Sequence, residues 1–135
     1  MTTPRTLMSR IARDRLAIAG TRASVRAAAP LTIDQAIEAL DAAGEVLRRL
    51  SEETNDAQLL ARYHAAQRAI LKEIIALAKI ALSQHDAEYR VLTANFRKAK
   101  DDLVAAKTKA NELADRLNLT ADVLGAMTKL ISAIG

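Results

Sequence analysis

Apolar residues recur alternately three and four positions apart from Tyr89 to Ile134, and only Thr120 interrupts the fourteen positions of this pattern. The spacing keeps one stripe of a helix facing a partner and is typical of coiled-coil-like packing. It predicts that another part of the chain, or a second copy, covers the stripe. We call these positions the apolar seam: Tyr89, Leu92, Phe96, Ala99, Leu103, Ala106, Ala110, Leu113, Leu117, Thr120, Leu124, Met127, Ile131 and Ile134.

Upstream of the seam, residues 33–50 show a helix with a clear start signal. Thr32 and Gln35 have the spacing of a capping box, in which each side chain satisfies a backbone N–H of the first turn. Ile33, Leu40 and Leu47 lie on one stripe of this helix. The polar run that begins at Ser51 predicts its end.

The next predicted helix spans residues 56–82 and begins at a cap formed by Asn55 or Asp56. Its apolar residues extend over far more than one stripe. A helix that is apolar over most of its circumference is normally buried among several neighbours, so we expect it at the centre of a bundle. The predicted solvated edge consists of Arg68, Lys72, Glu73, Ala76 and Lys79.

The apolar repeat slips out of phase at residues 83–86, and two explanations are open. One continuous helix can absorb the slip as a stutter. Alternatively the chain reverses, with Ser83 capping a new helix over residues 86–118. We favour reversal, because a single helix from 56 to 134 would exceed about 100 Å. Antiparallel pairing would then bring Leu92 near Ala76, Ala99 near Ile70 and Ala106 near Arg62.

A last break is predicted at residues 118–120, where Asn118 can adopt a left-handed cap and Thr120 can start a helix over residues 120–134. The predicted fold class is therefore all-α. We expect an elongated helical bundle or an antiparallel coiled-coil hairpin of four to five helices in one domain, residues 31–135. The long hairpin would pair helix 56–82 with residues 86–134.

Residues 1–30 contain six Arg and a single acid, which indicates a basic arm or a marginal helix. Such an arm could contact the phosphates of DNA or RNA. The next thirty residues hold seven acids and two Arg, so pairing with that acidic helix, within the chain or between subunits, is the favoured interpretation. The candidate basic contacts are Arg5, Arg10, Arg13, Arg15, Arg22 and Arg26.

Composition argues against catalysis, cofactors and metals. The chain has no Cys or Trp, and Tyr63, Tyr89 and Phe96 are its only aromatic residues, which leaves few groups to anchor a ligand. His64 and His85 lack the spacing of a helical zinc pair. We find no phosphate-binding loop, nucleophile motif or di-iron ligand set. We therefore expect a protein that is not an enzyme.

The leading hypothesis is a non-enzymatic helical interaction or scaffold protein that forms a homo-oligomer or binds a helical partner through the apolar seam. Without a signal peptide or transmembrane helix, we expect a cytoplasmic location, although a secreted effector or organellar import stays open. A second hypothesis is a membrane-active protein that inserts the apolar residues 119–134 into a bilayer surface. The predicted interface residues are Leu92, Phe96, Leu103, Leu113, Leu117, Leu124, Met127 and Ile131.

Overall fold

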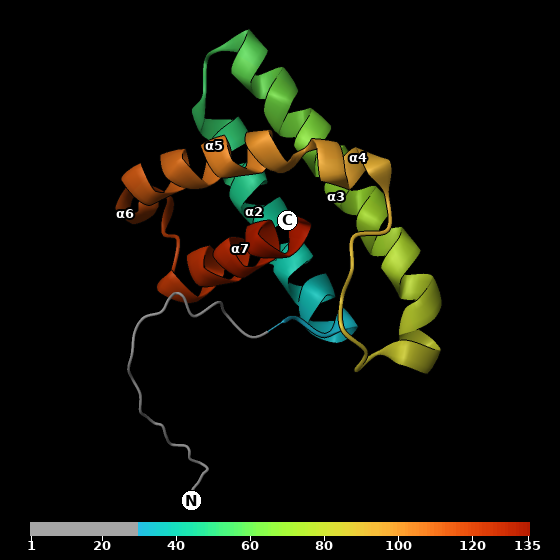
Figure 1. The fold of residues 1–135 in the computed structure, drawn as a ribbon. Coiled ribbons are helices and arrows are strands. Elements are labelled where there is room, and N and C mark those ends of the chain that lie inside the picture. The colour runs from blue at the N-terminus through green and yellow to red at the C-terminus, as the bar shows by residue number, and fades with distance from the viewer. Residues whose placement is uncertain (1–29) are drawn as a thin grey trace, which may run out of the picture.

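A computed structural model describes residues 30–135, and within that range the chain is built of helices without a β-strand (Figure 1). The all-α class is confirmed. The basic arm predicted for residues 1–30 falls, apart from Pro30, outside the described residues. The six helices of this range are α2 (Ile33–Glu53), α3 (Ala57–Gln84), α4 (Ala94–Lys98), α5 (Lys100–Glu112), α6 (Ala114–Leu117) and α7 (Ala121–Ile134).

Helix α2 begins at the predicted capping box. The Thr32 N–H donates to Gln35 Oε1 at 3.0 Å, and the Gln35 N–H donates to Thr32 Oγ1 at 3.1 Å. The helix continues to Glu53, three residues beyond the predicted end. Helices α3 and α7 both pack against α2, and α2 carries the largest share of the buried core. Its buried residues are Ile33, Ala36, Ala39, Leu40, Ala43, Val46, Leu47 and Leu50.

Helix α3 starts at Asp56, whose carboxylate accepts hydrogen bonds from the backbone N–H groups of Gln58 and Leu59. It lies along α2 and is not surrounded by other helices, so the expectation that residues 56–82 lie at the centre of a bundle was wrong. One face remains open to solvent, where Leu82 is 93% exposed. Wide apolar coverage of α3 therefore reflects one buried face and one exposed apolar face.

Residues 85–93 are not helical, so both a continuous helix and a helix beginning at residue 86 are wrong. The segment runs alongside the start of α2, where Ile33 N–H donates to the Ala87 carbonyl and Tyr89 N–H donates to the Leu31 carbonyl, at 2.9 and 2.7 Å. These long-range bonds satisfy backbone groups that a helix would pair locally. The next helix begins at Ala94 with Thr93 as its cap.

Helices α4, α5 and α6 form one interrupted course, with breaks at Ala99 and Leu113. In Figure 1 this course crosses α2 and α3, while α3 runs beside α2. Residues 56–82 and 86–134 therefore do not form one long antiparallel hairpin. One contact close to the expected pairing of Arg62 with Ala106 is present, because Arg62 Nε lies 3.9 Å from Asp102 Oδ1, one helical turn from Ala106.

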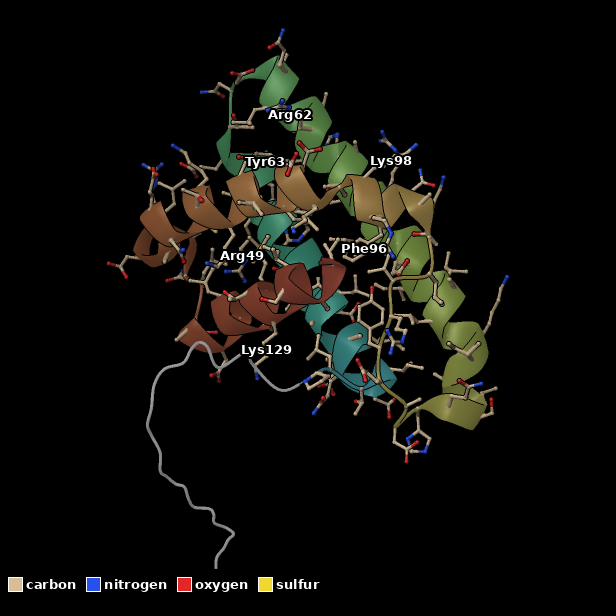
Figure 2. All side chains as sticks on the ribbon, in the orientation of Figure 1. Arg49, Arg62, Tyr63, Phe96, Lys98 and Lys129 are labelled. Carbon is tan, nitrogen blue, oxygen red and sulfur yellow. The ribbon has the colours of Figure 1, made fainter. Side chains whose placement is uncertain are left out.

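Helix α7 follows the predicted break. Asn118 adopts a left-handed conformation with φ 56°, and the Thr120 side chain accepts from the Val123 N–H. Arg49 on α2 holds this junction by donating to the Leu117 and Asn118 carbonyls (Figure 2). Among residues 30–135, no helix has both the length and the apolar composition needed to cross a bilayer.

Candidate interaction surface

The apolar seam lies mostly inside the protein's own core. Phe96, Leu103 and Met127 are fully buried, and Figure 2 shows Phe96 at the inner side of α4. Four further predicted interface residues, Leu113, Leu117, Leu124 and Ile131, are partly buried and pack against that core. Leu92 is the exception, since 49% of its surface is exposed. In this fold the chain itself covers most of the predicted interface.

The C-terminal helix is apolar because it is packed against the rest of the fold. Met127, Leu130 and Ile134 are buried, and α7 contacts both α2 and α5. This packing explains the apolar content of residues 119–134 that motivated the membrane hypothesis. The six Arg residues proposed as nucleic-acid contacts lie outside the described residues.

A different apolar surface is exposed on α3. Leu71, Ile75 and Leu82 are 57%, 51% and 93% exposed, and Ala78 between them is also exposed. The spacing of four, three and four residues places all four side chains on one side of the helix. We call Leu71, Ile75, Ala78 and Leu82 the outer row. Exposed apolar residues scattered singly are common, whereas a contiguous set is a candidate contact surface.

Basic residues flank the outer row. Arg68, Lys72 and Lys79 are exposed on α3, on the side of the row that faces away from α2. The single acidic residue of α3, Glu73, points the other way and is fully buried. The outer surface of α3 therefore combines apolar and positively charged groups without a carboxylate.

The neighbouring helix α2 exposes acidic residues. Asp34 and Asp41 are exposed along it, while Glu38 is exposed on the side that lines a cavity with Lys129 of α7. Where α3 ends beside the start of α2, His85 Nδ1 lies 3.4 Å from Asp34 Oδ2. Farther along α2, Glu45 is held between Arg48 and Arg49, and their hydrogen bonds lower its pKa to about 2.

Glu73 fixes the orientation of α3 from the inside. Its carboxylate accepts from Tyr89 Oη at 2.7 Å, from the Leu92 and Thr93 N–H groups at 2.8 and 2.9 Å, and from Thr93 Oγ1 at 2.8 Å. Burial, and then the bond to Glu73, raises the pKa of the Tyr89 hydroxyl, so this group stays a donor. The prediction that Glu73 lies on a solvated edge was wrong. Four donors to one carboxylate hold the inner face of α3 against residues 89–93, which leaves the outer row to solvent.

The described residues also form an open cavity of about 610 Å³ between Pro30, residues 88–91, α4 and α7. Arg90, Arg97 and Lys129 line it together with one carboxylate, Glu88. Arg97 donates to the Ile134 carbonyl at 3.4 Å, and Lys129 lies on the outer side of α7 (Figure 2). Across residues 30–135, no group of three His, Asp or Glu side chains is arranged to hold a metal ion.

Sequence reasoning missed the outer row because it counted Leu71, Ile75 and Leu82 among residues to be buried. A usable signal was present in the sequence, since the apolar positions of residues 56–82 are too many for one stripe, and Arg68, Lys72 and Lys79 lie among them. No protein-family model, curated protein or solved structure matches this chain.

Proposed function

We propose that this protein is a non-enzymatic helical interaction protein and that the outer row of α3 is its binding surface. The aligned exposure of Leu71, Ile75 and Leu82 is the observation that supports this proposal. Removing such side chains from water is favourable by about 1.5–3 kcal/mol each when burial is complete. A partner gains that free energy only by covering the row.

The outer row suits a helix as its partner. Its alternating spacing of four and three residues is the spacing of the contact positions in paired helices. The coiled-coil-like contact expected of this protein is therefore proposed for α3, in place of the apolar seam that its own core uses. Most of the remaining outer surface of α3 is charged or polar, which confines the contact to one side of the helix.

Cysteine labelling tests this function whatever the partner is, because the native chain contains no Cys. The test position is Leu82→Cys in the outer row, and the control is Val104→Cys, a 43% exposed residue of α5. Dilute purified protein should react with a thiol reagent at both positions. Adding excess wild-type protein, or an extract of the cells that express it, should slow labelling at position 82 and leave position 104 unchanged.

Two results would overturn the proposal. One is equal labelling at positions 82 and 104 under every condition, which would mean that nothing covers the outer row. The other is protection of position 82 by anionic lipid vesicles and by no protein. The bases beside the row would then serve a membrane surface, which is the competing function.

A further inference from the structure

The outer row lies between an acidic strip and a basic strip. Gly44 of α2 lies against Ile70, since a Cβ added to this glycine would be 4.0 Å from Ile70 Cγ2. Successive residues of a helix are turned by about 100°, so Leu71 lies about 100° around α3 from that contact and Lys72 about 200°. Asp41 precedes Gly44 by three residues, so it lies about 60° around α2 from the same contact, and because α2 and α3 are antiparallel it lies on the same face as Leu71. Crossing this face from α2 outward, the order is acid, apolar, base.

This order makes the face complementary to itself under one particular symmetry. A twofold axis that runs parallel to α3 reverses the order of the strips when two copies face each other. Apolar residues then meet apolar residues, and the acids of each α2 face the bases of the other α3. A twofold axis perpendicular to α3 within the face would instead place acid against acid and base against base. Twofold contacts of this self-complementary kind are the commonest in homo-oligomers.

We infer that a second copy of this chain covers the outer row, with the two α3 helices side by side and parallel. We make this inference on the basis of the proposed function, for which it names the partner. Each residue of the row then lies near its own counterpart, so that Leu71 meets Leu71 and Leu82 meets Leu82. Helix pairs of this kind, with apolar residues at the alternating contact positions, are the parallel coiled-coil geometry.

Within residues 30–135, the charges beside the row are exposed and are not paired with one another or with other side chains. They are Lys72, Lys79 and Asp41, none of which forms an ion pair with another described residue. The row covers only three turns of helix, whereas a standard interface buries about 800 Å² on each partner. The flanking charges must therefore contribute contact, and the dimer should weaken as salt is added.

Charge reversal tests the identity of the partner. Light scattering across a concentration series should show dimers of the wild-type protein. The double variant Lys72→Glu, Lys79→Glu and the variant Asp41→Lys should each raise the dissociation constant by about tenfold or more, because each creates like charges across the contact. Mixing the two variants should restore association, since acid then faces base at both strips. Wild-type protein that stays monomeric, or a mixture that associates no better than its components, would overturn the inference.

Single cysteines decide the direction of the two helices. In the parallel arrangement, Leu71→Cys and Leu82→Cys each form a disulfide-linked dimer alone under mild oxidation, and Val104→Cys does not. An antiparallel pair would instead link Leu71→Cys to Leu82→Cys only in a mixture of the two. That result would contradict the parallel geometry and leave the binding surface standing. If cell extract protects position 82 and added wild-type protein does not, the partner is another protein. That result would contradict the second copy as partner and would still agree with the proposed function.

Discussion

Glu73 shows how one buried side chain sets the path of the backbone around it. Its carboxylate is fully buried and accepts four hydrogen bonds, two of them from backbone N–H groups of the non-helical segment 85–93. A buried charge is tolerated when hydrogen bonds replace the water that it loses. The segment 85–93 thus exchanges local helical bonds for bonds to α2 and to Glu73.

Replacing Glu73 with Gln should destabilise the protein by about 2–4 kcal/mol. The amide NH₂ group of Gln cannot accept hydrogen bonds, so some of the N–H and O–H groups that donate to the Glu73 carboxylate would lose their acceptor. Urea unfolding followed by circular dichroism measures this change. The control Glu88→Gln alters an exposed carboxylate of the same segment and should change the free energy of unfolding by less than about 0.5 kcal/mol. Equal effects of the two substitutions would show that the Glu73 hydrogen bonds do not hold the segment.

Glu45 gives a pH dependence at the surface of α2. Its pKa is lowered from 4.5 to about 2 by hydrogen bonds from Arg48 and Arg49. A lowered pKa in the folded state adds stability above the unfolded value, and that stability is lost as the pH falls from about 4.5 towards 2. The side chain is 39% exposed, so solvent screening limits the effect to about 1 kcal/mol or less.

The stability difference between wild type and Glu45→Gln should therefore be present at pH 7 and shrink between pH 4.5 and 2. Urea unfolding at a series of pH values measures it, and the shift of the Glu45 carboxyl carbon in NMR gives its pKa directly. A difference that does not vary with pH, or a titration midpoint near 4.5, would contradict the role of the two arginines.

At the scale of elements, the sequence predicted helix ends correctly where the hydrogen bonds that form them join residues close together in the chain. The Thr32 capping box and the left-handed Asn118 were predicted and are present, and of the two predicted caps, Asn55 and Asp56, the structure uses Asp56. The segment 85–93 was mispredicted because its partners are remote, namely Leu31, Ile33 and Glu73. No short-range pattern of apolar residues contains that information.

Substitutions in α7 test whether the apolar residues of this helix belong to the core. Met127 is fully buried and α7 packs against α2, so Met127→Ala should lower the free energy of unfolding by about 2–4 kcal/mol through lost burial and a residual cavity. Lys129→Ala on the exposed side of the same helix should change it by less than about 0.5 kcal/mol. If Met127→Ala is as harmless as Lys129→Ala in chemical unfolding, α7 is not docked as described.

At the scale of the whole molecule, the sequence supported the right fold class, but its apolar pattern did not tell a stripe covered by the same chain from a stripe left open to solvent. A heptad pattern predicts that an apolar stripe packs against another surface, but it does not indicate whether that surface belongs to the same chain or to a partner. Here the seam residues Phe96, Leu103 and Met127 are covered from within, while Leu71, Ile75 and Leu82 are open. Deciding which apolar face closes the core requires the path of residues 85–93, which the pattern did not give.

The apolar seam is mostly buried and the outer row is exposed. Thiol reactivity in dilute protein tests this difference most directly, because one experiment compares the two sets of residues in a chain without native cysteine. Leu103→Cys represents the buried seam and Leu82→Cys the outer row. We predict that position 82 reacts at the rate of an exposed thiol, while position 103 stays protected until denaturant unfolds the protein. Fast reaction at position 103 together with protection at position 82 in the dilute monomer would contradict the account.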